Sequence, residues 1–334
     1  MHFPSVSIIV PARNEECHIA EALSSLCTLQ YGPLEIVVVD DNSDDRTAHI
    51  VERFISTYAG PSQLRLLTVS EEPPKGWVGK TFATDFAIKE STGELIVVCD
   101  VDVRHTPESL REIVRVFLRH RLDMLSQLPH FDVRSPLEYP LLYQTFLLYR
   151  ASQLAARLGS RQSFGMGTYL LFTRDFYLLS GGWSMHRSYP ESLSLINYCL
   201  KGGGHFAFLG DSGAISARMY VGAAETFRGL VRNSNFALLQ PLPLFFTVAW
   251  YSLFIEALLL AAAGSILAVI LILILVGMFM AHVLHSRYPP RLALSAGLLS
   301  PLMPFYFLIV AGAALLRQLF GIPLTWRGRR MRPQ

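Results

Sequence analysis

The sequence predicts an α/β domain built on a mostly parallel sheet, followed by C-terminal transmembrane helices. Two observations lead to this fold class. Short aliphatic runs alternate with segments of helical spacing in the first part of the chain, which is typical of a parallel sheet covered by helices. Hydrophobic residues make up 51% of the 334 residues and charged residues only 16%, with most of the apolar surplus near the C-terminus. We therefore predict a globular domain at residues 1–235 and a membrane region at residues 236–334.

The globular domain is expected to alternate strands with helices. The aliphatic runs that predict strands lie at residues 6–10, 34–39, 64–69 and 95–98. The segments of helical spacing lie at residues 19–26, 50–55, 81–91 and 106–118. Asn14 is expected to cap the first helix, because its side chain can accept a hydrogen bond from a free backbone N–H group. Alternation of this kind predicts a doubly wound parallel sheet.

The strand at residues 95–98 is followed by two carboxylates, Asp100 and Asp102. Residues two apart on an extended backbone point to the same side, so two like charges face one spot and repel each other. A bound divalent cation removes this repulsion, and Mg²⁺ or Mn²⁺ prefers oxygen ligands. For an isolated pair of acids, capping of the next helix is the simpler alternative.

Other strand exits carry acids as well, namely Glu15 after the first strand and Asp40 and Asp41 after the second. The carboxyl ends of parallel strands meet at one edge of the sheet, where open α/β sheets bind ligands. Carboxylates can accept hydrogen bonds from a ribose or a base, and can hold a cation that neutralises a diphosphate. The chain has no Gly-x-Gly-x-x-Gly after the first strand and no Gly-x-x-x-x-Gly-Lys, so neither a dinucleotide fold nor a P-loop is supported.

Three motifs in order resemble the donor-site motifs of family 2 glycosyltransferases of the GT-A fold, a Rossmann-like α/β fold. They are Val6-Ser-Ile-Ile-Val-Pro-Ala-Arg-Asn-Glu15, Val37-Val-Val-Asp-Asp-Asn-Ser43 and Cys99-Asp-Val-Asp102. Three further stretches resemble the membrane-attached branch that glycosylates carotenoid and other polyisoprenoid lipids, including hopanoid-associated transferases. These are Pro73-Pro-Lys-Gly-Trp-Val-Gly-Lys-Thr-Phe-Ala83, Arg218-Met-Tyr220 and Thr325-Trp-Arg-Gly-Arg-Arg330. The resemblance implies inverting transfer of a hexose from a nucleotide-diphosphate sugar, UDP-glucose above all, to a lipid acceptor.

The resemblance also implies roles for individual residues. Asp41 would read the uracil edge, and Glu15 or Asp40 would lie near the ribose. Asp102 would coordinate the Mg²⁺ or Mn²⁺ ion, and Asp100 would contact the ribose or a water on that ion. The other residues expected on the donor-nucleotide side are Pro11, Arg13 and Lys80. Lys80 is a charge partner for the diphosphate in this interpretation, although a lysine in a glycine-rich loop is commonly just solvated.

The acceptor or sugar side is expected to include Trp77, Gly182 and Trp183. An aromatic plug for its own loop explains Trp77 equally well, and ordinary turns explain the glycine pair before Trp183 equally well.

The general base is the place where the sequence departs from the family pattern. An inverting transfer to an alcohol needs a base that removes the hydroxyl proton. In the family this base is the aspartate of a Glu-Asp pair, and here Glu191 is followed by Ser192, whose hydroxyl cannot serve as a base near neutral pH. Two alternatives follow: Glu191 acts as the base from the neighbouring position, or it caps the helix, because Ser188-Tyr-Pro-Glu191 is a capping-box signature. A catalytically impaired donor-binding or scaffold protein is therefore the alternative function.

Three apolar segments follow the globular domain, at residues 242–263, 266–284 and 292–316, each long enough to cross a membrane. Pro301 and Pro304 break the helix of the third segment, so we expect it to be re-entrant or interfacial. This arrangement keeps the arginine clusters on the cytoplasmic side. Residues 136–159 carry an apolar stripe that suits either a helix lying on the membrane or core packing.

Location and partners follow from these features. Met1 is followed almost at once by the first strand, so we expect no signal peptide and a multi-pass protein of the cell membrane with its catalytic domain on the cytoplasmic side. A net charge of +3 and the lack of a basic stripe exclude nucleic acid as a partner. A processive polysaccharide synthase is disfavoured because the chain lacks a Gln-x-x-Arg-Trp stretch.

Overall fold

The computed structural model describes residues 3–159, 163–185, 191–234, 241–322, 324–326 and 329–331. The chain forms two compact units. The first unit comprises Met1–His130, Gly165–Ala217 and Thr325–Gln334, and the second comprises Phe131–Phe164 and Arg218–Leu324. The second unit therefore contains residues 136–159 and 218–234, which the sequence analysis assigned to the globular domain.

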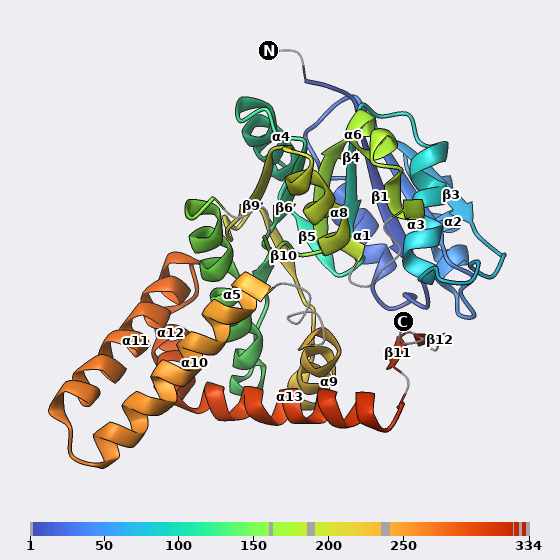
Figure 1. Ribbon diagram of the computed structural model, residues 1–334. Helices are drawn as coiled ribbons and strands as arrows, with labels where there is room; N and C mark the ends of the chain where they lie inside the picture. Colours follow the sequence, from blue (N-terminus) through green and yellow to red (C-terminus); the bar gives the residue numbers. More distant parts are fainter. Residues whose placement is uncertain are drawn as a thin grey trace. The chain divides into compact units, whose positions relative to one another are not determined.

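A seven-stranded sheet forms the centre of the first unit (Figure 1). In spatial order its strands are β3 (Gln63–Thr68), β2 (Leu34–Asp40), β1 (Val6–Ala12), β4 (Leu95–Cys99), β8 (Tyr169–Thr173), β6 (Met124–Gln127) and β9 (Phe206–Leu209). Pairing is parallel from β3 to β4 and between β6 and β9, whereas β8 is antiparallel to both its neighbours. Six of these seven strands thus run in one direction, which confirms the predicted mostly parallel sheet.

The central strands are buried on both faces, as their unbroken aliphatic runs predicted. Every residue of β1, β2 and β4 is buried. Pro11 has no N–H to donate to a neighbouring strand. It lies near the end of β1, beyond Val6–Ile9, which is the part of β1 that pairs with β4. A second, three-stranded sheet has the order β5 (Val103–His105), β10 (Ile215–Ala217) and β7 (His130–Phe131), and β5 is antiparallel to β10.

The helices of the first unit follow the predicted alternation. They are α1 (Ile19–Leu26), α2 (Thr47–Thr57), α3 (Gly79–Glu90), α4 (Ser109–Arg119), α6 (Arg174–Leu179), α7 (Gly182–Met185) and α8 (Glu191–Lys201). The prediction that Asn14 caps α1 is wrong. Asn14 has a positive φ of 53°, and its side-chain oxygen accepts a hydrogen bond from the backbone N–H of Asp44 at 2.9 Å. His18 occupies the N-cap position of α1 instead.

The second unit is helical. Its elements are η1 (Pro136–Glu138), α5 (Tyr139–Arg157), α9 (Gly222–Ser234), α10 (Pro241–Ala262), α11 (Ile266–His285), α12 (Pro290–Leu299), η3 (Ser300–Leu302) and α13 (Met303–Leu319). The unit also contains Phe131, the second residue of the short strand β7 (His130–Phe131). The three predicted apolar segments are all helical. The proline-containing segment does not stop at Pro301, because a single 3₁₀ turn joins α12 to α13.

Two stretches of the described chain are long and apolar enough to cross a membrane, Ile266–His285 and Pro290–Leu319. Length and composition alone support this, and a buried helix of a soluble protein can pass the same test. Many large apolar side chains on these stretches are exposed, for example Leu267 at 79% and Leu319 at 70%. Exposed apolar surface of this kind indicates association with a membrane or another apolar partner.

Helix α5 packs against α10, α11 and α13. Four residues of the predicted stripe, Leu141, Leu142, Phe146 and Leu147, are 5% exposed or less, whereas Leu137, which precedes the helix, is 60% exposed. The Nε1–H group of Trp250 on α10 donates a hydrogen bond to Tyr143 Oη at 2.9 Å, which ties the two helices together. The apolar stripe is therefore used for packing between helices, the alternative to a helix lying on the membrane.

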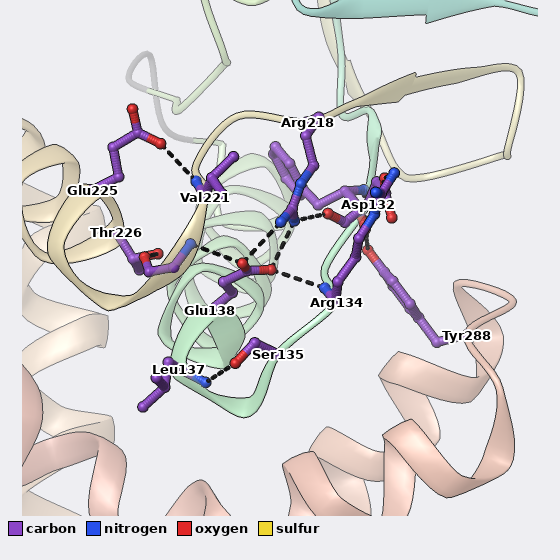
Figure 2. Close-up of polar contacts among 12 residues, drawn as sticks. Asp132, Arg134, Ser135, Leu137, Glu138, Arg218, Val221, Glu225, Thr226 and Tyr288 are labelled. Carbon is purple, nitrogen blue, oxygen red and sulfur yellow. Dashed lines mark hydrogen bonds and ion pairs between the residues drawn. The ribbon is translucent and has the colours of Figure 1, made fainter.

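A buried glutamate joins two distant segments of the second unit (Figure 2). Glu138 is 2% exposed and accepts two hydrogen bonds from the guanidinium of Arg218, at 2.7 and 2.9 Å. The backbone N–H groups of Arg134 and Gly222 also donate to its carboxylate. Burial opposes the charged form, but these hydrogen bonds outweigh it and lower the pKa of Glu138 to about 2.

Candidate active site

The carboxyl ends of β1, β2 and β4 meet at one edge of the sheet, because the three strands are parallel and adjacent. Ala12 at the end of β1 pairs with Asp40 at the end of β2, and the backbone N–H of Asp41 donates to the carbonyl of Ala12 at 2.9 Å. Both aspartates are buried, at 3% and 2% exposure. The structure thus brings the predicted acids of these exits to one place.

Asp40 shapes the loop that follows β2. Its carboxylate accepts hydrogen bonds from the backbone N–H and the hydroxyl of Ser43, at 3.2 and 2.5 Å. Arg13 supports the same loop from β1, since its guanidinium donates to the backbone carbonyls of Asp41 and Asn42. Arg13 is 8% exposed, so these contacts favour a role in holding the loop in place.

Asp100 and Asp102 follow β4, and a lysine lies beside them. Lys80, on the first turn of α3, forms an ion pair with Asp100. Oδ1 of Asp102 is buried and has no hydrogen-bond partner among the described residues. Burial, together with the charges of Asp100 and Glu15, raises the pKa of Asp102 to about 7, although the charge of Lys80 opposes this rise. Glu15 of the first strand exit therefore shares an electrostatic environment with the acids after β4.

These acids fit a hard divalent cation. A buried carboxylate oxygen without a partner is costly, and a cation would supply the missing interaction. Within the described residues, no three His, Cys, Asp or Glu side chains are grouped closely enough to hold a metal ion alone. Mg²⁺ and Mn²⁺ sites that serve phosphate chemistry commonly use one or two carboxylates, with substrate oxygens completing the coordination. Asp102 and Asp100 match that kind of site.

Glu15 is buried, at 8% exposure, and lies 3.1 Å from His18 Nδ1. Its backbone N–H donates to the Thr47 hydroxyl at 2.8 Å. The exit of β1 is thus fixed to the start of α2, which holds Glu15 at the ligand-binding edge of the sheet.

The residues predicted for the acceptor side lie in different surroundings. Trp77 packs edge-on against Phe82 of α3, with ring centroids 5.5 Å apart, which suits an aromatic plug for its loop. Trp183 is 2% exposed and packs against Tyr177 and Phe172, so its indole fills the core. Gly182 has a positive φ of 56°, and a Cβ there would lie 2.5 Å from the Tyr177 ring. Close packing accounts for Gly182 and for the ring of Trp183, although the buried indole N–H of Trp183 has no hydrogen-bond partner among the described residues.

The position at which the sequence analysis expected an aspartate base holds a buried serine. Ser192, in the first turn of α8, is 6% exposed. A Cβ added to Gly167 would lie 3.2 Å from its hydroxyl oxygen, so Ser192 faces the segment that leads into β8. Residues 186–190 and the side chain of Glu191 lie outside the described part of the structure, as does the predicted capping box.

A histidine and an aspartate that the sequence analysis did not pair also come together in the first unit. Nδ1 of His130 lies 2.8 Å from Oδ2 of Asp211. The aspartate side chain is 4% exposed and that of the histidine 29%. The two residues are 81 positions apart, so no local sequence signal could have joined them.

Comparison with known proteins identifies the family. The model of the family "Glycosyl transferase family 2" matches residues 7–178, which is more than half of the chain and includes all the strand exits described above. The chain belongs to glycosyl transferase family 2. The transferase is 39% identical over 109 residues to a probable glycosyltransferase of Bacillus subtilis, covering 32% of this chain and 24% of that protein.

Two further relatives carry more specific names. A β-monoglucosyldiacylglycerol synthase of Trichormus variabilis is 35% identical over 121 residues, 36% of this transferase and 25% of that protein. A 4,4'-diaponeurosporenoate glycosyltransferase of Staphylococcus haemolyticus is 25% identical over 182 residues, 53% and 46% of the two chains. The transferase thus spans between a quarter and a half of the length of these curated relatives.

A solved structure shares the fold along nearly the whole chain. It is a mannosyltransferase from Pyrobaculum calidifontis in complex with GDP-mannose and Mn²⁺. The TM-score is 0.55 at 20% sequence identity, covering 96% of the transferase and 88% of that chain. The predicted GT-A-like fold is confirmed.

Proposed function

We propose that this transferase moves a hexose from a nucleotide-diphosphate sugar to a lipid acceptor, with inversion at the anomeric carbon. The observation that carries the proposal is the buried, unpartnered Oδ1 of Asp102, which lies among Asp100, Glu15 and Lys80 at the ligand-binding edge of a GT-A-like sheet. The two named relatives support a lipid acceptor, since their names refer to diacylglycerol and to a carotenoid carboxylate.

The donor side follows from the residues at the strand exits. Asp102 and Asp100 would hold a Mg²⁺ or Mn²⁺ ion, which when bound offsets the negative charge of the diphosphate leaving group. Lys80 adds a second positive charge beside the same acids. Asp40 is the last residue of β2 and Asp41 follows it, and hydrogen bonds hold both in place. Asp41 would accept a hydrogen bond from the nucleobase and Asp40 from the ribose, with Glu15 close by. UDP-glucose is the proposed donor.

The apolar helices support a membrane location for the reaction. A lipid acceptor stays in the bilayer, so an enzyme that binds the bilayer reaches it without extracting it into water. We propose that the helices of the second unit anchor the chain and that the first unit faces the cytoplasm. Labelling of an added cysteine at residue 334 tests this orientation, and labelling from outside intact cells would contradict it.

A transfer assay tests the proposed function. The full chain in detergent is mixed with UDP-glucose carrying a labelled sugar, Mn²⁺, and phosphatidylcholine vesicles that contain either dioleoylglycerol or a carotenoid carboxylate. Label in the lipid phase with UDP-glucose, and much less with GDP-mannose, is the expected result. A folded protein that binds UDP but transfers to neither lipid would favour the alternative that Ser192 motivates, a donor-binding or scaffold protein.

A further inference from the structure

The contact between His130 and Asp211 has the geometry of a base and the carboxylate that orients it. Nδ1 of His130 lies 2.8 Å from Oδ2 of Asp211. A carboxylate only accepts hydrogen bonds, so Nδ1 is the donor in this contact, and an imidazole in its neutral form then carries its lone pair on Nε2. The other oxygen of Asp211 accepts a hydrogen bond from the backbone N–H of Gly213 at 2.9 Å, which fixes the carboxylate.

Both residues follow strands whose carboxyl ends lie at the same edge of the main sheet as that of β4. His130 comes three residues after the end of β6, and Asp211 two residues after the end of β9. β8 is antiparallel to both β4 and β6, so β6 and β9 run in the direction of β4. With strands spaced about 4.8 Å apart, β6 lies roughly 10 Å from β4 across the edge. The strand exits that lead to Asp102, His130 and Asp211 thus lie along one edge of the sheet.

The exits of β6 and β9 are also fixed to each other. The backbone N–H of Leu128 donates to the carbonyl of Leu209 at 3.0 Å. The side-chain amide of Gln127, which is 1% exposed, donates to the carbonyl of Gly210 at 2.7 Å. The segment before each member of the pair is therefore rigidly held, which a positioned catalytic group requires.

The same half of the edge contains the family's base position, occupied here by Ser192. The reaction still needs a base when the acceptor is an alcohol. Ser192 is buried near Gly167, next to the start of β8, and β8 lies between β4 and β6. The residue that replaces the missing aspartate should therefore belong to the strand exits around β8.

We propose that His130 is the general base of the transfer reaction and that Asp211 is its positioning residue, an inference that rests on the proposed function. Nε2 of His130 takes the proton of the acceptor hydroxyl as the acceptor oxygen bonds to the anomeric carbon. The bond from that carbon to the diphosphate oxygen breaks, and its electron pair leaves with the nucleoside diphosphate. The imidazolium then passes the proton to water.

The chain offers a matched control at the opposite ends of the same two strands. His205 directly precedes β9 and Asp123 directly precedes β6, and Nδ1 of His205 lies 3.8 Å from the Asp123 carboxylate. This histidine is 72% exposed and lies at the amino-terminal edge, away from the donor-site acids. His205→Ala should leave transfer unchanged.

The acceptor provides the sharpest test, because a carboxylate acceptor is already ionised at neutral pH and needs no base. Transfer is measured with the full chain, UDP-glucose and phosphatidylcholine vesicles containing dioleoylglycerol or 4,4'-diaponeurosporenoate. His130→Ala should lower kcat on the hydroxyl lipid by about 10²–10⁴-fold. The donor KM and the rate on the carboxylate lipid should change less than threefold. Added imidazole should restore part of the lost rate.

Two further variants keep the test decisive. His130→Asn places an N–H group at the position of Nδ1, so it can keep the contact with Asp211 without supplying a base, and it should show the same selective loss. Asp211→Asn can donate a hydrogen bond to Nδ1 and so favours the wrong tautomer, which should lower kcat on the hydroxyl lipid about 10²-fold or more.

Several results would overturn the role of His130. One such result is full activity of both position-130 variants on dioleoylglycerol. Another is an equal loss of activity on the two lipids, which is what a purely structural role would give. A wild-type chain that transfers only to the carboxylate lipid would overturn the role of His130 as general base but would leave the transferase function intact. A wild-type chain that binds UDP and transfers to neither lipid would overturn both the proposed transferase function and the role of His130 as general base.

Discussion

Asp102→Asn is expected to remove Mn²⁺-dependent transfer, lowering kcat/KM by roughly 10³-fold. A metal ion that neutralises a leaving diphosphate supplies several kcal/mol of transition-state stabilisation, and about 4 kcal/mol corresponds to a factor of about 10³. The amide has the shape of the carboxylate but lacks its charge, so only the interaction with the cation is lost. Initial rates at increasing Mn²⁺ concentration, with UDP-glucose and a lipid acceptor, measure the effect.

The stability of the same variant separates a lost ligand from a misfolded protein. Burial, with the charges of Asp100 and Glu15, raises the pKa of Asp102 to about 7, so the ionised form is disfavoured in the metal-free fold. Asp102→Asn should therefore raise the Tm of the metal-free protein while it removes activity. Asp44→Asn is the matched control, because Asp44 is an acid of the same edge with a side chain 79% exposed, and it should leave both quantities unchanged. Full Mn²⁺-dependent activity of Asp102→Asn would contradict the assignment.

Glu138→Gln is expected to lower the free energy of unfolding by about 3 kcal/mol at pH 7. Removal of one partner of a buried ion pair leaves the other charge uncompensated, which costs roughly 3–5 kcal/mol. Arg218 would lose its carboxylate, and the segments before η1 and before α9 would lose the contacts that join them. Denaturant unfolding of the detergent-solubilised chain, followed by a signal from the second unit, measures the change.

The pH dependence of this contribution has a definite sign. The pKa of Glu138 is lowered from 4.5 to about 2, so the stabilisation is present above about pH 4.5 and is lost as the pH falls toward 2. The shift corresponds to roughly 3 kcal/mol. Glu138→Gln should lack this acid-dependent loss. Glu225→Gln is the control, since exposed Glu225 accepts a hydrogen bond from the backbone N–H of Val221 beside the same cluster. Equal acid sensitivity of Glu138→Gln and wild type would contradict the role.

The sheet and its acidic edge could be predicted from sequence because both depend on local patterns. Unbroken aliphatic runs predict strands buried on two faces, and acids directly after such runs must lie at the carboxyl edge. Asp40, Asp41, Asp100 and Asp102 lie where that reasoning placed them. The turn at Asn14 could not be predicted in the same way, because its partner, the backbone of Asp44, comes from the next strand exit.

The features that the sequence left open depend on contacts between distant segments. The stripe on α5 suits a membrane surface and a helical core equally, and only the packing of Trp250 against Tyr143 decides between them. Trp183 has the composition of an acceptor contact, but the rings of Phe172 and Tyr177 enclose it. His130 and Asp211 meet because β6 and β9 are neighbours in the sheet, and strand order across an antiparallel β8 cannot be read from spacing.

Equilibrium binding of UDP to the detergent-solubilised full chain, with and without Mn²⁺, tests the donor site most directly. The site described here predicts binding at least tenfold tighter with Mn²⁺, and loss of that gain in Asp102→Asn. Binding of GDP under the same conditions reports which nucleobase the donor site prefers. A folded protein whose affinity for both nucleotides is unaffected by Mn²⁺, or whose Asp102→Asn variant binds as tightly as wild type, would contradict a cation-dependent donor site at this edge of the sheet.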